Sequence, residues 1–253
     1  MGGSTESLID MTNAFNDMGI DCIMYGPHKY HLDKCRSGTH EEISISHEDS
    51  VIFHFLRVRD RPKCKSIILS SHETTVFPLN EINLTPFDKI RFVSEHQREW
   101  HNIEYPSFVL GNLPPDLQRS PELKEKVGGV VGTIMENKQT HKAIQWALED
   151  GCSIVNVYGN IGEVGYYDQE VSPIIENNPR VQYKGWITDK QKIYDEFTDF
   201  YTVSKSETFC RGKVECEITG RNFHCPADAN YANMKYNLSR KDIMDQWVKE
   251  LGL

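Results

Sequence analysis

The sequence predicts an α/β protein built from two Rossmann-like domains, each with a parallel sheet. Three observations support this fold class. Short apolar runs rich in β-branched residues alternate with stretches of helical periodicity. A proline-rich polar stretch at 112–121 interrupts this alternation, which then starts again. The composition, with 38% hydrophobic and 26% charged residues, is that of an ordinary globular protein. Open sheets of this kind bind ligands at the carboxyl ends of their strands, so we expect both sheets to face an interdomain cleft.

The first half begins with an expected amphipathic helix at 7–18, where apolar side chains recur at helical spacing. The apolar runs that follow predict strands at 21–26, 50–56, 66–70, 88–94 and 107–111. Gly2, Gly3 and Ser4 are typical of the glycine turn between a first strand and a helix, although almost no strand precedes them. Either that strand lies upstream of a trimmed or alternative start, or the fold has lost it.

The second half repeats the pattern. Its expected helix at 138–150 stops at Gly151. A final helix at 239–251 opens with a Ser-x-x-Asp capping pattern. The predicted strands are 126–134, 153–160, 181–186, 199–204 and 222–226. We therefore place domains at 1–112 and 113–236, followed by a C-terminal helix at 237–253 that packs back on the N-terminal domain.

Charge and cysteine content exclude several classes of protein. The formal net charge of -9 argues against a general nucleic-acid coat. The run RVRDRPKCK, 57–65, is either a solvated loop or a local patch for an anionic partner. Among the seven cysteines, Cys210 and Cys216 lie near His224, but no CxxC is present, so we expect reduced thiols and no metal site. No apolar run could span a bilayer and no secretory signal is seen, so a cytoplasmic location is expected.

Two carboxylates, Glu207 and Glu215, have seven residues between them, with Ser204 before them and Gly220 after them. In order and spacing, this segment resembles the C-terminal domain of the retaining GT-B glycosyltransferases, the group-1 family that includes glycogen synthase-like and sucrose synthase-like enzymes. The resemblance implies that a helix starts between the two glutamates. The family's Gly-Phe-Gly turn is TFCRG here. The resemblance covers about 126–226 well and 2–112 only in outline.

The resemblance implies roles for particular residues. Glu207 would hold hydroxyls of the donor sugar, and Glu215 would hold the ribose hydroxyls. Lys138 would neutralise the diphosphate leaving group, together with the amides at the helix start. Thr133 stands where the family has an arginine after Gly132, and Arg211 and Lys213 are the candidates to replace it. His72 matches a family histidine near the donor sugar, so we group it with Glu207 and Lys138 as catalytic. The other implied donor positions are Gly132, Thr133, Gly159, Ile187, Ser204, Phe209, Cys210, Arg211 and Gly212.

The resemblance also implies an activity. It predicts metal-independent transfer of a sugar from a nucleoside-diphosphate sugar, most simply a UDP-sugar, to a hydroxyl with retained configuration and no cofactor. The acceptor would contact Gly2, Gly3, Ser4, Arg57 and Arg59, and it is a glycan, a lipid-linked glycan or hydroxymethylated DNA. Nucleic acid is expected only as an acceptor, and the oligomeric state is not predicted. Because the chain is compact for the family, a virus or phage origin, and then the host cytoplasm, is an option.

Two alternatives remain open: a non-catalytic binding domain of the same fold, and a nucleotide-sugar epimerase. A dinucleotide oxidoreductase is set aside, because no G-x-G-x-x-G follows a strand with an acidic residue about twenty positions later.

Overall fold

The computed structural model describes residues 3–26, 35–54, 58–72, 79–236 and 239–253, with side chains from residue 5 onward. The chain divides into two compact units. Unit 1 comprises Met1–Pro114 and Tyr236–Leu253, and unit 2 comprises Pro115–Lys235. The change of unit after Pro114 lies within the proline-rich stretch that interrupts the sequence pattern.

In the described part of unit 1, a four-stranded parallel sheet has the strand order β3-β4-β5-β6. These strands are β3 (Ser50–His54), β4 (Ser66–Ser71), β5 (Lys89–Phe92) and β6 (Ser107–Val109). A separate parallel pair is formed by β1 (Met24–Gly26) and β2 (Ser37–Thr39). The helices of this unit are α1 (Gly3–Asp17), α2 (Glu95–His101) and α8 (Arg240–Leu251), with 3-10 turns η1 (His40–Glu42) and η2 (Leu79–Glu81).

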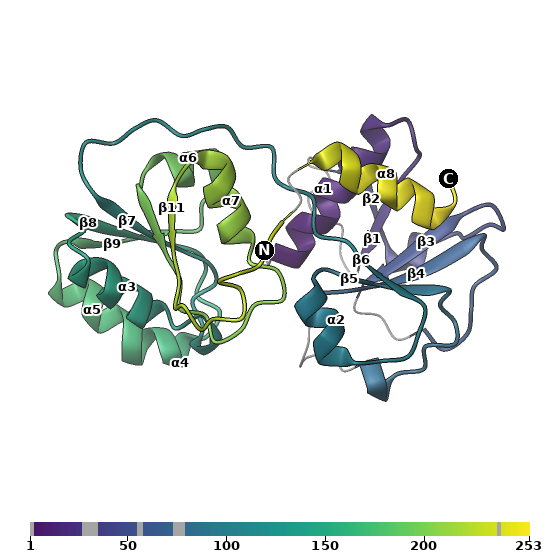
Figure 1. Cartoon of the computed structure of the whole chain (residues 1–253), viewed down its shortest axis with the longest axis horizontal. Helices are drawn as coiled ribbons and strands as arrows, with labels where there is room; N and C mark the ends of the chain where they lie inside the picture. The colour runs from purple at the N-terminus through teal and green to yellow at the C-terminus, as the bar shows by residue number, and fades with distance from the viewer. Residues whose placement is uncertain (1–2, 27–34, 55–57, 73–78, 237–238) are drawn as a thin grey trace. The chain divides into compact units, whose positions relative to one another are not determined.

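Strand β4 is buried on both faces, as expected for a parallel sheet covered on two sides. On one face, Ile68 packs in a core with Phe15 of α1 and Trp247 of α8. On the other face, Ile67 packs in a second core with Phe92. Figure 1 shows α1 and α8 side by side on this unit. The C-terminal helix thus packs on the N-terminal unit, as the sequence predicted.

Unit 2, whose residues are all described, is a five-stranded parallel sheet with helices on both faces. The strand order is β11-β10-β7-β8-β9. The strands are β7 (Val127–Val131), β8 (Ile154–Tyr158), β9 (Val181–Gly185), β10 (Asp199–Tyr201) and β11 (Asn222–His224). The helical elements are η3 (Glu136–Lys138), α3 (Thr140–Glu149), α4 (Val164–Tyr166), η4 (Tyr167–Val171), α5 (Ser172–Asn177), α6 (Lys190–Asp195) and α7 (Arg211–Thr219).

Each face of this sheet has its own core. Ile144 of α3 packs with Val155 and Val171 on one face, and Ile193 of α6 packs with Phe197 and Cys216 of α7 on the other. Figure 1 shows α3, α4 and α5 on one side of the sheet and α6 and α7 on the other. The predicted mixed α/β architecture with parallel sheets is therefore confirmed.

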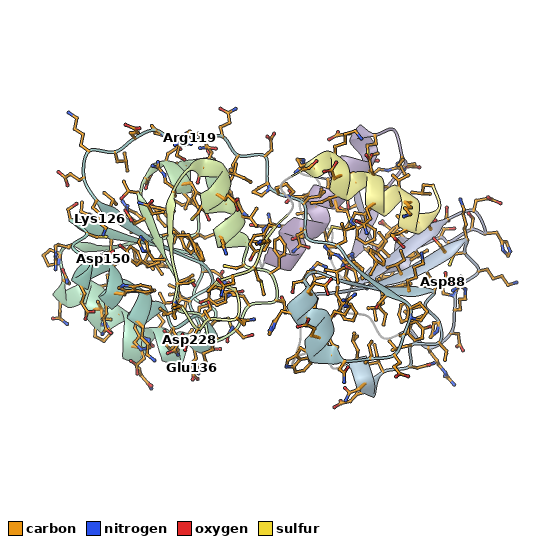
Figure 2. All side chains as sticks on the ribbon, viewed as in Figure 1. Asp88, Arg119, Lys126, Glu136, Asp150 and Asp228 are labelled. Atoms are coloured by element: carbon orange, nitrogen blue, oxygen red, sulfur yellow. The ribbon has the colours of Figure 1, made fainter. Side chains whose placement is uncertain are left out.

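The strand order of unit 2 creates a switch point between β7 and β10. From β7 the chain proceeds to β8 and β9 on one side, and then returns to form β10 and β11 on the other side. The connections after β7 and β10 therefore leave in opposite directions, and in open α/β sheets ligands bind at this place. At the opposite, amino-terminal edge, Lys126 and Asp150 form an ion pair of 2.7 Å (Figure 2).

The predicted helices are present, although α1 begins at Gly3 rather than at residue 7 and α3 begins at Thr140 rather than at residue 138. Gly220 caps α7 in the left-handed conformation with a φ of 74°, a conformation that favours glycine. The Ser239 side chain accepts a hydrogen bond from the backbone N–H of Asp242, which caps α8. Searching the described residues for a helix long and apolar enough to cross a membrane gives none.

Candidate active site

The site is built on the loops that leave β7 and β10 in unit 2. Lys138 ends the 3-10 turn η3 after β7, and Glu207 lies in the loop after β10. The Lys138 Nζ donates to Glu207 Oε1 at 2.6 Å, although the residues are 69 positions apart. Both side chains remain partly accessible, at 31% for Lys138 and 17% for Glu207. The structure thus brings together two of the three residues predicted to be catalytic.

The loop that carries Glu207 is held by the segment after β11. Asn230 accepts from the backbone N–H of Glu207 at 3.2 Å and donates to its carbonyl at 2.7 Å. The Tyr231 hydroxyl donates to the carbonyl of Ser204 at 3.1 Å. The backbone N–H of Lys205 donates to the carbonyl of Asn137 at 2.9 Å, which joins this loop to the loop after β7. These bonds fix the backbone on both sides of the Lys138–Glu207 pair.

Glu215, on α7, is buried and its carboxylate is bound by other residues of unit 2. Its Oε1 accepts from Lys190 Nζ and its Oε2 accepts from the Tyr194 hydroxyl, both at 2.6 Å. The guanidinium Nε of Arg211 lies 3.5 Å from Oε1. Burial raises the pKa of Glu215, but the charges of Lys190 and Arg211 more than offset this and hold it below its usual value. A role in ribose binding stays a prediction, and it would require these oxygens to share or exchange partners.

The segment between the two glutamates begins helix α7, as predicted. Cys210 is the N-cap residue and is buried, and this burial raises the pKa of its thiol, which is therefore neutral at pH 7. Gly212 lies against Phe200, because a Cβ atom there would be 2.6 Å from the ring. Phe209 precedes Cys210 in the chain and is half-buried. The first backbone amides of α7 follow directly on the loop that carries Glu207.

The other predicted donor residues follow the neighbouring strands and lie at the same edge of the sheet. Gly132 and Gly159 have φ values of 150° and 139°, and a Cβ on Gly159 would lie 1.9 Å from the Gly132 carbonyl oxygen. Only glycine allows this approach of the two strand ends. The Thr133 hydroxyl donates to Asn160 at 3.3 Å. Ile187 follows β9 and is half-buried.

His72, the third predicted catalytic residue, directly follows β4 in unit 1. It is buried, and its Nε2 lies 3.0 Å from Nδ1 of His54. Gly3 and Ser4 form the start of α1, whereas Gly2 and Arg57 lie outside the described residues. Arg59 is exposed.

Two other cations of the basic run take part in internal contacts. Both terminal nitrogens of the Arg61 guanidinium donate to Asp88, and Lys65 Nζ donates to the carbonyl of Gly252. These contacts favour the reading of the run as a structural surface loop.

Sequence reasoning missed two features. The first is that Lys190 and Tyr194 bind the carboxylate of Glu215; both belong to a short helix with no distinct periodicity. Arg91 is the other: it is buried on β5. Its signal was available, because a charged residue within the apolar run DKIRFVS of a two-sided parallel sheet has to be buried. Among the described residues, no group of three or more His, Cys, Asp or Glu is arranged to hold a metal ion.

Comparisons with known proteins agree on the fold. No protein-family model and no curated protein sequence matches the chain. Among solved structures, HepE from Anabaena, in complex with UDP and glucose, matches with a TM-score of 0.70 and 12% identity over 99% of this chain and 88% of that chain. AviGT4, a glycosyltransferase involved in avilamycin A biosynthesis, matches with a TM-score of 0.65 and 11% identity over 100% and 90%.

The larger protein TarM from S. aureus, solved in complex with UDP, matches with a TM-score of 0.50 and 16% identity over 74% of this chain. The chain spans only 44% of the length of TarM. At these identities the comparisons establish the fold, and that fold is GT-B.

Proposed function

We propose that this chain is a glycosyltransferase that moves a sugar from a UDP-sugar to a hydroxyl acceptor, with retention of anomeric configuration and without a metal ion. The observation that carries the proposal is the Lys138–Glu207 ion pair at the switch point of unit 2, beside the start of α7. A cation, a carboxylate and the amides of a helix start at one place match the three needs of a nucleotide-sugar donor: charge for its diphosphate, acceptors for its hydroxyls, and donors for its phosphate oxygens.

In the proposed reaction, Lys138 leaves Glu207 and pairs with the diphosphate. The carboxylate of Glu207 is then free to accept hydrogen bonds from hydroxyls of the donor sugar. The bond between the anomeric carbon and the phosphate oxygen breaks, and the acceptor oxygen bonds to the same carbon on the same face. The acceptor proton passes to the departing phosphate, so UDP leaves with the bond electrons and the proton. Lys138 and the α7 amides stabilise the charge that develops on that phosphate.

The neighbours support UDP as the nucleotide, because HepE and TarM were solved with it. We propose a glycan, a lipid-linked glycan or hydroxymethylated DNA as the acceptor. The internal contacts of Arg61 and Lys65 argue against DNA as the acceptor, because these two cations of the basic run already bind groups of the protein. A DNA acceptor would also make the rate fall steeply with salt.

Titration calorimetry with UDP, followed by a UDP-release assay on UDP-sugars, tests the proposal. Lys138→Ala should weaken UDP binding by at least about tenfold, because it removes a charge-assisted contact to the diphosphate. Lys205→Ala is the matched control: Lys205 lies on the Glu207 loop, is more exposed and pairs with Glu136, so UDP affinity should change less than about twofold.

Glu207→Ala separates binding from chemistry. It should lower turnover by at least about tenfold, because bonds to the sugar tighten in the transition state. UDP affinity should stay the same or tighten slightly, because Lys138 loses the partner with which the diphosphate competes. Failure of wild-type protein to bind UDP would reject the proposal. UDP binding with no turnover of any UDP-sugar would instead support the non-catalytic alternative.

A further inference from the structure

Unit 1 contains a buried arginine in the middle of its parallel sheet. Arg91 lies on β5 and only 2% of it is exposed. Its Nε donates to the carbonyl of Leu110 at 2.6 Å, and its two terminal nitrogens donate to Ser70 Oγ and Asn112 Oδ1, both at 3.0 Å. The Trp247 ring lies under the guanidinium at 5.6 Å. The side chain is therefore held in one position by neutral groups.

The charge of Arg91 has no counter-charge among the described residues. Its remaining contact, at 3.4 Å, is with Nε2 of His72, and none of its ion pairs or hydrogen bonds involves a carboxylate. Burial lowers the pKa of Arg91 to about 9, which still leaves it positively charged at neutral pH. A buried cation that is solvated only by neutral dipoles is costly, so such a site favours the entry of an anion.

His54, one of the two histidines at this site, does not change this balance. Burial, followed by the charge of Arg91, lowers the pKa of His54 to about 3, so this imidazole is neutral. Its Nδ1 contacts His72, whereas its Nε2 is buried and has no hydrogen-bond partner among the described residues. The site therefore holds a polar atom without a partner among the described residues, beside a charge that none of them neutralises.

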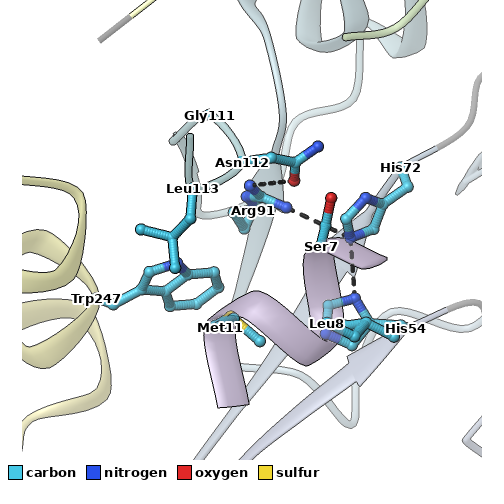
Figure 3. Close-up of a pocket in the computed structure, with 10 residues that line it drawn as sticks. All are labelled: Ser7, Leu8, Met11, His54, His72, Arg91, Gly111, Asn112, Leu113 and Trp247. Carbon is cyan, nitrogen blue, oxygen red and sulfur yellow. Dashed lines mark hydrogen bonds between the residues drawn. The ribbon is translucent and has the colours of Figure 1, made fainter. Parts of the chain in front are cut away.

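A small cavity lies among these groups, lined by Ser7, His54, His72, Arg91 and Asn112 on its polar side and by Trp247 on its apolar side. Figure 3 shows the Ser7 side chain, from α1, reaching into the space between Asn112 and His72. The cavity lies at the carboxyl ends of β3 and β4, the edge at which open sheets bind ligands. It has room for about one water-sized group. One oxygen of a ligand, rather than a whole sugar, would therefore lie beside the guanidinium.

We propose that this Arg91 cavity binds one oxygen of an oxyanion, the phosphate or carboxylate group of a small molecule whose remaining atoms lie outside the cavity. Arg91 supplies the charge, and the donors to that oxygen are the Ser7 hydroxyl, the Asn112 amide nitrogen and His54 Nε2, in the tautomer that carries its proton on that nitrogen. Where the proposed glycosyl transfer holds, and on that condition only, the oxyanion belongs to the acceptor, because the residues proposed to hold the diphosphate and ribose of the donor, Lys138 and Glu215, lie in unit 2. The acceptor class is then a phosphorylated or acidic molecule.

The test is thermal unfolding of the full chain at constant ionic strength with inorganic phosphate, glucose 1-phosphate or acetate. Wild-type protein should gain about 3–6 °C at a concentration near ten times Kd. Arg91→Gln should lose most of this gain, and comparison at equal concentrations cancels the general stabilising effect of phosphate. The matched control is Lys63→Gln, which removes an exposed cation of the same unit and should keep the full gain.

The ligands also distinguish the source of the oxyanion. Tighter binding of glucose 1-phosphate than of inorganic phosphate identifies a group on a larger molecule, and equal or weaker binding identifies a free inorganic anion. Equal gains in wild type and Arg91→Gln for all three ligands, or loss of the gain in Lys63→Gln alone, would overturn the proposal.

Should Arg91→Gln not fold, ring-nitrogen NMR of wild-type protein decides the matter. Signals of His54 and His72 should move on addition of the best ligand, whereas those of the exposed His47 should stay. Unmoved His54 and His72 signals would contradict an oxyanion in this cavity. UDP binding, measured on the same sample, is independent of this result. If UDP does not bind but the His54 and His72 signals move, only the transferase proposal is rejected. If UDP binds but these signals do not move, only the oxyanion site is rejected.

Discussion

Replacement of Glu215 by glutamine tests whether the carboxylate in the middle of unit 2 is held by charge. Glu215 is 5% exposed and pairs with Lys190, whose side chain is 25% exposed. Breaking a fully buried pair costs roughly 3–5 kcal/mol. The partial exposure of Lys190 and the hydrogen bond that glutamine can still accept from Tyr194 reduce this, so we expect a loss of about 2 kcal/mol, or about 5–10 °C in the melting of unit 2.

The effect of Glu215→Gln should depend on pH in a defined direction. The pKa of Glu215 is lowered in the folded state from its usual value of 4.5. The stabilisation is therefore fully present above the unfolded pKa, and it is lost as the pH falls through the folded pKa. Urea unfolding followed by circular dichroism should show a large difference between wild type and Glu215→Gln at pH 7, and a smaller one below about pH 4.

A double-mutant cycle with Lys190→Met serves as the control. This single change leaves the Glu215 carboxylate buried without its main counter-charge, so it should cost at least as much as Glu215→Gln. The double variant should recover part of the loss, because neither charge is then left alone. Equal stability of wild type and Glu215→Gln at pH 7, or a difference that does not change with pH, would refute the reasoning.

Three further substitutions test the packing of side chains inside each unit. Gly129→Ala should destabilise unit 2 by about 1–3 kcal/mol in urea titrations, because the new Cβ would lie 2.3 Å from the Phe197 ring; unchanged stability would mean that the ring moves aside freely. Trp247→Ala should cost about 3–5 kcal/mol in the unfolding of unit 1, since Trp247 is 1% exposed, and a wild-type melting curve would show that α8 adds little to this core. Gly159→Ala should lower the melting temperature by several degrees, whereas the control Gly165→Ala, with open space around its Cβ position, should not; equal effects would argue against the close approach of the strand ends.

Most of the strands were predictable because they are short apolar runs in the sequence. The run SIILS gave the position of β4 closely, since Ile67, Ile68 and Leu69 are all buried. Strand β2 was missed because its sequence, Ser-Gly-Thr, has no apolar residue and its position depends on pairing with β1. The region 164–177 was missed because a π-helical segment interrupts its helices and shifts their periodicity.

The candidate site was predictable where the sequence resembles a known family. That resemblance indicated a helix start between Glu207 and Glu215, and α7 begins there. That Lys138 reaches Glu207 depends on the order of β7 and β10 in the sheet, and only the resemblance to a known family suggested it. The capture of Glu215 by Lys190 and Tyr194 depends on how α6 packs on α7, which no local pattern encodes.

The course of the chain through the two units has a consequence for synthesis on the ribosome. Unit 2 is one continuous segment, Pro115–Lys235, so all of its core residues have been made before the last segment of unit 1. Unit 1 begins first but lacks Ile243, Trp247 and Leu251 of its core until α8 emerges. We therefore expect unit 2 to complete its fold before unit 1, the reverse of the usual order in which the N-terminal domain folds first. Until α8 is made, the apolar face of α1 stays exposed or is covered by a chaperone.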